Sequence, residues 1–358
     1  MEKVENMELE KLVEKGIDSL LFSSPVLATD LERFLKEEGD RIKALAQRAF
    51  DEKVEQYYWV GSGNSWLNLA PGKYILDQMT DITSDVLISY EFVWRNPKRL
   101  KKNTWVFVSS FSGATEDTVE ALRHANESGA TTISLVDKAD SLLGREANEV
   151  IAYNSKALYI LPMAAVYLFA LELARLNGAS GTEEIVADIY RLPELFAKQF
   201  EQEREPMKKL AKEFLDERMI YTLASGPNFW LGYKFGLTVF MENMRVNGSF
   251  MDATEFRHGP AEVFDREKPA FVILKGTDSS RELVERVNDI CQNNGAHVTV
   301  FDSADHGDFH SLLAPFILMI PLQWFAVWST LMRGITDLDE RVLMGRGIMA
   351  KGEGVTWP

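Results

Sequence analysis

A serine-rich loop at residues 109–115, SSFSGAT, carries the clearest chemical signal in the chain. It lies between an apolar stretch typical of a strand and a helical pattern that begins at Thr115. The amides at a helix start, together with the hydroxyls of Ser110, Ser112 and Thr115, can form a cradle for a phosphate. Because the loop carries no lysine, it is not a nucleotide-binding loop of the Gly-Lys-Ser kind.

A second loop, GSGNS at 61–65, follows another apolar stretch and favours the same interpretation. Hydroxyls from two adjacent loops at the ends of one sheet's strands can converge on one anion. Either loop alone could equally be a polar turn that only caps its helix. The expected phosphate site comprises Gly63, Ser65, Ser110, Ser112, Gly113 and Thr115.

The elements around these loops alternate between strand and helix. Residues 1–56 show helical spacing, whereas YYWVGSG and TWVFVSSFSG read as strands that enter loops, and TTISLVD and EVIAY as further strands. A strand–loop–helix–strand order at this spacing predicts an α/β fold with a parallel sheet and helical crossovers.

The second half of the chain echoes the first. The stretch 219–230, MIYTLASGPNFW, is similar to 57–66, and 271–302 is similar to 106–137, both at an offset of about 163 to 166 residues. Two matches at one offset indicate a duplicated α/β unit. Because KGTDSS in the second half lacks Ser-x-Ser-Gly, we expect one phosphate site per chain. The predicted divisions are a helical segment 1–56, domains 57–200 and 201–345, and a tail 346–358.

Composition and charge restrict the class of partner. The 358 residues are 46% apolar and 26% charged, as in globular proteins. With 39 Lys and Arg against 54 Asp and Glu, the net charge of −15 argues against nucleic acid and anionic membrane surfaces. A single cysteine, Cys291, excludes a disulfide framework, and the acidic N-terminus lacks a secretion signal. We therefore expect a cytoplasmic protein.

Two apolar stretches, 157–174 and 312–332, are long enough to raise the question of a membrane. Both contain proline near the start, and the first also contains Glu172. We expect buried helices, since large α/β proteins bury helices on all sides. The segment DHGDFH gives His306 and His310 a metal-like spacing, but it reads as a polar loop, and we expect no metal there.

Two motifs together resemble a known family. SSFSGATEDT with GSGNSW resembles the sugar isomerase (SIS) domain, whose serine-rich loop holds the phosphate of a phosphosugar. The segment 255–265, EFRHGPAEVFD, resembles the second SIS domain of glutamine–fructose-6-phosphate amidotransferases and fructosamine-6-phosphate deglycases. The likeness covers roughly residues 30–358. It implies two tandem SIS domains, each a parallel sheet flanked by helices, after a helical N-terminal segment.

The resemblance assigns roles to residues that the pattern alone leaves undecided. It implies that Glu242 moves the proton between C1 and C2 of the sugar, and that His258 assists ring opening from a neighbouring subunit of a homodimer. It also places Lys351 on a tail over the sugar. Without it, Glu242 reads as a solvated or capping residue and His258 as a loop residue bonded to backbone. Asp252 and Glu255 are expected to hold the His258 loop.

Two departures point to the deglycase branch. Phe235 stands where the amidotransferases have a second glutamate, seven positions before Glu242, and the chain has no N-terminal cysteine to release ammonia from glutamine. The implied reaction cleaves a 6-phosphorylated sugar–amino acid adduct, of fructosamine or glucosamine type, to glucose 6-phosphate and a free amino acid. It proceeds through an enaminol and an imine and needs no metal or organic cofactor.

Two other functions remain open. The same proton transfer would serve a phosphosugar aldose–ketose isomerase or an aminosugar-phosphate deaminase, and SIS domains also occur in non-catalytic phosphosugar-binding proteins. The sequence leaves undecided which amine is released, whether the adduct is a ketose or an aldose, the size of the oligomer, and whether Lys351 acts in catalysis.

Overall fold

The computed structural model describes residues 6–343, which form two compact units. The first unit is built on residues 29–190, and the second on residues 191–340 together with the chain up to Ala28. This division passes through helix α2 (Ser24–Asp51) and helix α9 (Thr182–Gln202). The domain boundaries predicted from the sequence, at 56/57 and 200/201, differ from this division because they follow the strand pattern. The predicted tail 346–358 lies outside the described residues.

The first unit contains a five-stranded parallel sheet in the order β2-β1-β3-β4-β5. β1 and β3 are direct neighbours, with Gly61 opposite Ser109. Their carboxyl ends therefore lie side by side, as the two-loop phosphate site requires. The strands are β1 Gln56–Gly61, β2 Thr83–Ile88, β3 Thr104–Ser110, β4 Thr131–Val136 and β5 Glu149–Ala152.

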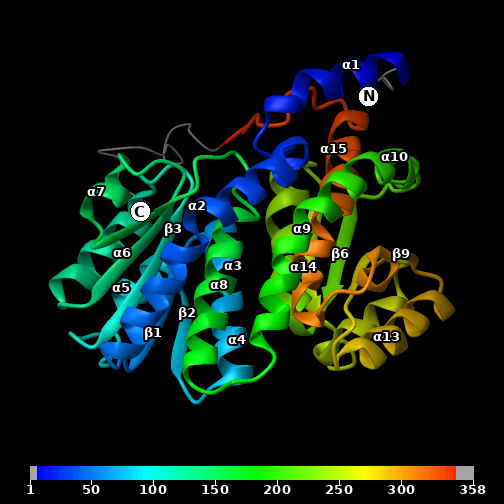
Figure 1. Cartoon of the computed structure of the whole chain (residues 1–358). Helices are drawn as coiled ribbons and strands as arrows, with labels where there is room; N and C mark the ends of the chain where they lie inside the picture. The colour runs from blue at the N-terminus through cyan, green and yellow to red at the C-terminus, as the bar shows by residue number, and fades with distance from the viewer. Residues whose placement is uncertain (1–5, 344–358) are drawn as a thin grey trace. The chain divides into compact units, whose positions relative to one another are not determined.

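Helices cover both faces of this sheet (Figure 1). Trp59 and Phe107 point to one face, where their rings stack at 4.6 Å and contact Phe169 of α8. Val60 and Val108 belong to a separate apolar cluster on the other face. This alternation is the period of two that a pleated strand imposes. The helices are α3 Asn64–Leu69, α4 Pro71–Met79, α5 Ser89–Arg95, α6 Glu116–Glu127, α7 Leu142–Glu146 and α8 Leu161–Leu176.

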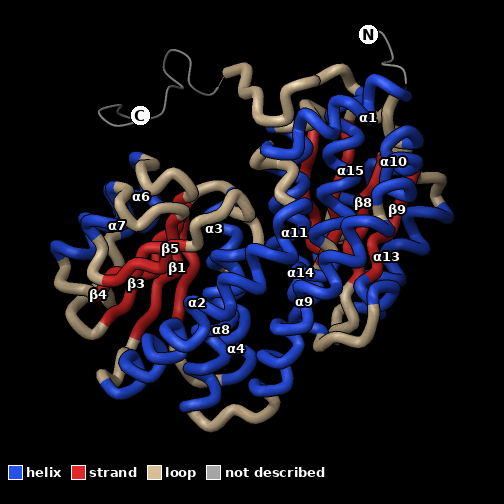
Figure 2. Tube along the Cα trace, turned by 45° about the horizontal axis from the view of Figure 1, so that its top comes forward, coloured by secondary structure: helices blue, strands red, loops and turns tan. Residues whose placement is uncertain are grey.

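The second unit contains a four-stranded parallel sheet in the order β7-β6-β8-β9. This order repeats β2-β1-β3-β4 of the first unit, as expected of a duplicated unit, and helices again flank the strands (Figure 2). The strands are β6 Met219–Ala224, β7 Asn247–Asp252, β8 Ala270–Lys275 and β9 His297–Asp302. The helices are α1 Asn6–Lys15, α10 Arg204–Glu213, α11 Phe229–Lys234, α12 Phe240–Glu242, α13 Arg281–Asn293, α14 Ala314–Ile317 and α15 Met319–Met332.

Short turns complete the second unit. Phe235–Val239 is a single π-helical turn between α11 and α12. The 3-10 turns are η1 Gly16–Asp18, η2 Gly226–Asn228, η4 Ala253–Glu255, η5 Pro260–Asp265, η6 Ser303–His306 and η7 Ser311–Leu313. The sheet packs on α13 through a cluster that includes Phe271, Ile273 and the thiol of Cys291, whose pKa burial raises to about 12.

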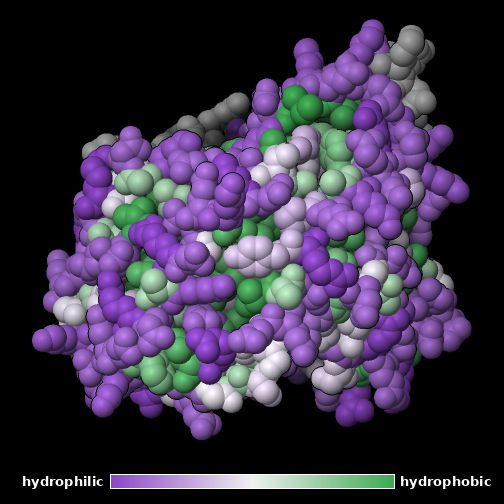
Figure 3. Space-filling model, viewed as in Figure 1, coloured by the Kyte–Doolittle hydropathy of each residue, from purple (hydrophilic) through white to green (hydrophobic). Residues whose placement is uncertain are grey.

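Both apolar stretches are core helices, as expected. α8 buries nearly all of its side chains. Among the described residues, one helical stretch, Ser311–Met332, has the length and composition to cross a membrane, yet 94% of its most apolar window is buried in the protein. The surface facing the viewer in Figure 3 is mainly hydrophilic, in agreement with the high content of charged residues.

Candidate active site

The serine-rich loop forms one hydroxyl cluster at the end of β3. Ser110 is the last residue of the strand, and its Oγ lies 2.7 Å from Thr115 Oγ1 and 3.4 Å from Ser112 Oγ. Thr115 is the N-cap of α6 but makes no side-chain cap, because its hydroxyl is engaged by Ser110. Three predicted phosphate ligands therefore meet beside a helix N-terminus, where the helix dipole favours an anion.

Gly113 closes the loop in a conformation that glycine favours. Its φ of 63° lies in the left-handed region, and its amide donates to Ser110 Oγ at 3.2 Å. A Cβ at this position would overlap the hydroxyl of Ser141. The Gly113 carbonyl also accepts from the amide of Leu143 at 2.8 Å, which ties the loop to α7. The tight turn thus depends on the missing side chain.

The loop after β1 is joined to the serine-rich loop by a hydrogen bond that the sequence pattern did not predict. Ser62 donates to the carboxylate of Asp117, in the first turn of α6. Gly63 has a φ of 55° and precedes α3, and Ser65 lies half-buried in the first turn of that helix. The Ser62–Asp117 bond holds the two neighbouring loops together. It also gives the acidic side chain at the helix start a partner within the loops.

Glu242 lies in the second unit, at the end of α12, the short helix that directly follows the π-helical turn. It is half-buried. The turn packs closely on the sheet at Gly236, where a Cβ would lie 2.5 Å from the carbonyl oxygen of Ser249 in β7. Thr222 of β6 fixes the same region by donating to the Gly232 carbonyl at 2.6 Å. Single π turns often occur at functional sites, and this one sets the position of Glu242 along the helix.

His258 lies in an exposed loop between η4 and η5. Its amide donates to the Glu255 carbonyl at 2.9 Å. Asp252 starts the loop by accepting from the Thr254 amide at 2.9 Å and from Ser225 Oγ at 2.6 Å. Phe256, buried against Phe271, anchors the loop to the sheet. Asp252 and the backbone of Glu255 thus hold the loop, as expected, while the imidazole of His258 faces solvent.

The structure describes Phe235 but not Lys351. Phe235, at the position of the second glutamate, is fully buried with its ring 6.2 Å from that of Phe240, so an apolar core residue occupies this site. Lys351 lies outside the described residues. Within residues 6–343, no group of three or more His, Cys, Asp or Glu side chains is arranged to hold a metal ion.

Lys234 is a buried titratable residue that the sequence interpretation missed. It ends α11, is 2% exposed, and its pKa is lowered well below the ordinary value because burial disfavours the charged amine. The available signal was a single lysine in the otherwise apolar segment WLGYKFGLTVF. Its place one residue before the π turn puts an ionisable group on the element that carries Glu242.

The chain is similar in sequence and fold to known proteins. The SIS-domain family model matches residues 53–176. Fructosamine deglycase FrlB of Bacillus subtilis (strain 168) is 31% identical over 297 residues, covering 80% of this chain and 90% of that protein. Fructoselysine 6-phosphate deglycase of Escherichia coli (strain K12) is 27% identical over 324 residues, covering 89% and 94%. A Bacillus subtilis structure described as a phosphosugar isomerase matches with a TM-score of 0.74 at 30% identity, covering 81% and 92%.

Replacement of Gly113 should damage the anion cradle specifically. We expect Gly113→Ala to weaken binding of glycerol 3-phosphate roughly ten-fold or more, because the loop must move away from Ser141. Gly129→Ala is the matched control, since Gly129 also has a positive φ, of 77°, but nothing lies within 4 Å of its Cβ position. Calorimetric titration of both variants measures the effect. Unchanged affinity in a folded Gly113→Ala variant would remove this loop from the phosphate site.

Lys234 should make stability depend on pH. Since its pKa is lowered in the folded state, the unfolded chain binds one more proton between that lowered pKa and the ordinary value of about 10.4. Stability should therefore rise with pH in this window. Lys234→Met should be more stable than the parent near neutral pH and lose that rise, as measured by urea unfolding from pH 7 to 9.5. Lys209→Met, at an exposed lysine, is the control, and equal slopes in all three proteins would contradict the assignment.

Proposed function

The chain belongs to the SIS-domain family of enzymes, and from this premise we propose that it is a deglycase acting on a 6-phosphorylated sugar–amino acid adduct. The products are glucose 6-phosphate and a free amino acid. The hydroxyl cluster of Ser110, Ser112 and Thr115 carries the proposal, because it suits the phosphate end of such a substrate. Two deglycase relatives, each matched over at least 90% of its own length, favour this reaction within the family.

The proposed phosphate contacts come from Ser65, Ser110, Ser112 and Thr115, with Gly63 and Gly113 shaping the loops. Binding of the phosphate at a fixed place orients the sugar. The free energy of these remote contacts then serves to position C1 and C2 for reaction. No lysine or arginine stands in the serine-rich loop, so hydroxyl and amide dipoles supply the stabilisation.

Glu242 and His258 are the proposed proton-transfer residues. His258 moves the proton that opens the sugar ring, a role suited to imidazole near neutral pH. Glu242 then removes a proton from C1 of the open-chain ketone, which gives an enaminol, and returns a proton to C2. The result is an imine at C1, and water hydrolyses it to the aldehyde of glucose 6-phosphate and the free amine. Glu242 is half-buried, and a carboxylate held within reach of C1 can act as the base of this step. Lys351 remains a further candidate on the same resemblance.

The alternative is a phosphosugar isomerase, and the description of the matched Bacillus subtilis structure supports it. That reaction uses the same C1–C2 proton transfer without hydrolysis of a carbon–nitrogen bond. Phe235 favours the deglycase, since the amidotransferase isomerases that the chain resembles have a glutamate at this position.

We further propose a cytoplasmic location, in keeping with one buried, unpaired cysteine.

A panel of 6-phosphorylated fructosyl and glucosyl amino acids tests the reaction directly. We expect glucose 6-phosphate release from at least one member, and Glu242→Gln should lower that rate roughly 10²- to 10⁴-fold while binding of the phosphosugar survives. Glu262→Gln, at an exposed carboxylate near His258, is the control and should keep full activity. Isomerisation of glucose 6-phosphate without hydrolysis of any adduct would favour the alternative. Full turnover by Glu242→Gln would remove Glu242 from the mechanism.

We also propose that the active form is a homodimer in which His258 serves the partner's site. Its exposed imidazole is available to a neighbour, and Leu237 and Met241, on the segment that carries Glu242, are exposed apolar side chains suited to an interface. Co-expression of Glu242→Gln with His258→Asn chains should restore about a quarter of parental activity, because half of the dimers then hold one intact site. Each variant alone should be inactive. Formation of mixed dimers without recovered activity would show that the site uses its own His258.

A further inference from the structure

A cavity of about 260 Å³ is lined only by residues of the second unit. It opens between the C-terminal part of α9, the start of α10 and the carboxyl end of β9 with η6. The lining includes apolar side chains, among them Leu195, Met207 and Pro321, and titratable ones, among them Glu203, Asp305 and His306. None of the predicted phosphate or proton-transfer residues lines it. The volume is below the roughly 300–1,000 Å³ of sites for drug-sized ligands, so an occupant must be small.

Two carboxylates of the lining, Glu203 and Asp305, lie close enough to repel each other, and Asp305 is also attracted by Arg281. Among the described residues, neither Glu203 nor Asp305 forms an ion pair with lysine or arginine. The Glu203 side chain is only 17% exposed, and its pKa is raised by burial and by the negative charge of Asp305. Asp305 is exposed, whereas Glu203 is partly desolvated, and a positive charge beside Glu203 would offset both its desolvation and its repulsion by Asp305.

The neighbouring histidine does not supply that positive charge. His306 Nδ1 lies 3.7 Å from Glu203 Oε1, beyond hydrogen-bond distance, and burial lowers the pKa of this imidazole. The third carboxylate of the cavity, Asp302, is different. Arg281 and Lys275 both bond to it at 2.8 Å, and these bonds outweigh burial and lower its pKa to about 2. Among the described residues of the lining, the carboxylates without a lysine or arginine ion pair are therefore Glu203 and Asp305, and the exposed Lys198 lines the same cavity.

We propose that this cavity binds a small molecule with a primary ammonium group next to a short aliphatic chain. The ammonium lies between Glu203 and Asp305, and the chain lies against Leu195, Met207 and Pro321. An ammonium suits the site better than a metal ion, because no set of three metal-ligating side chains is found here or elsewhere in residues 6–343. The mixed apolar and acidic lining also matches an alkylammonium rather than a bare cation.

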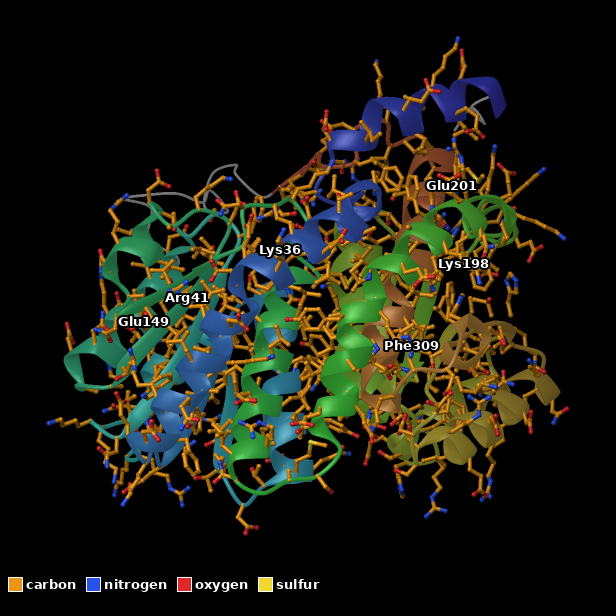
Figure 4. All side chains as sticks on the ribbon, viewed as in Figure 1. Lys36, Arg41, Glu149, Lys198, Glu201 and Phe309 are labelled. Carbon is orange, nitrogen blue, oxygen red and sulfur yellow. The ribbon has the colours of Figure 1, made fainter. Side chains whose placement is uncertain are left out.

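Two sources can supply this chemistry, a free amino acid or a simple amine. Lys198 also lines the cavity and is exposed, so it can bind the carboxylate of an amino acid whose ammonium group lies between Glu203 and Asp305. Figure 4 labels Lys198 and Glu201 on α9, the helix that forms this edge. The inference concerns binding alone and does not depend on the proposed reaction.

The test is calorimetric titration of the full chain with three related ligands. Norleucine carries ammonium and carboxylate, pentylamine lacks the carboxylate, and N-acetylnorleucine has no ammonium. We expect at least one of the two amines to bind and the acetylated compound not to bind. Glu203→Gln should weaken amine binding roughly ten-fold or more, because it removes a charged hydrogen-bond acceptor. Asp305→Asn should act in the same direction.

Glu201→Gln is the matched control, since it makes the same change on an exposed residue of α9 that does not line the cavity. Preferential binding of norleucine that is reduced in Lys198→Gln would identify an amino acid site. Equal binding of both amines would identify a simple amine site. Either outcome supports the proposal. Absence of binding by either amine would overturn it. So would equal affinity for N-acetylnorleucine, or a loss in Glu203→Gln no larger than in Glu201→Gln. Thermal unfolding of each variant checks that it is folded.

Discussion

The structure depends on one geometric constraint, that parallel neighbouring strands end at the same edge of their sheet. β1 and β3 pair directly, so the loops that follow them must lie side by side. The Ser62–Asp117 bond then joins the loops, and the Ser110–Thr115 bond at 2.7 Å orders the hydroxyls at the start of α6. A cradle without lysine or arginine works only if its dipoles are placed in advance, because each hydroxyl supplies far less than a full charge. Strand pairing provides that placement.

The duplicated unit shows what happens when the same geometry receives other side chains. In each unit five residues separate the second central strand from its helix, at 111–115 and at 276–280. Ser110 corresponds to Lys275 and Gly113 to Asp278, by position relative to the strand end and helix start. Lys275 and the following Arg281 are both engaged by Asp302. The second loop keeps hydroxyl residues at Thr277, Ser279 and Ser280 but has an ion-paired lysine where the first has Ser110, and one phosphate site per chain stays a prediction.

Local patterns predicted the parts of the fold that are set by local chemistry. The apolar runs YYWV and TWVFV predicted strands, and Thr115 marked the start of a helix, although its hydroxyl bonds to Ser110 and caps no helix amide. The π turn before Glu242 could not be predicted, since it depends on close packing of Gly236 against Ser249 in another strand. Nor could the Glu203–Asp305 pair, whose members lie on elements about a hundred residues apart in the sequence. Contacts of this kind arise only after the sheets have assembled.

In a chain of net charge −15, the proposed phosphate site depends on local rather than on global electrostatics. Charges on the surface are screened beyond about 8 Å at physiological ionic strength, so the distant excess of carboxylates weakens an anion site only slightly. Charges close to the cradle matter far more, and there Asp117, which with Glu116 is one of two acidic residues in the first turn of α6, accepts a hydrogen bond from Ser62. The same reasoning applies in reverse to the cavity beside α9. The acidic character of this cavity does not follow from the net charge. Asp302, which also lines it, is paired with Lys275 and Arg281, whereas Glu203 and Asp305 form no ion pair with lysine or arginine among the described residues. In both places the sign of the preferred ligand is decided by which neighbouring charges already have partners, and that property is set by tertiary contacts rather than by composition.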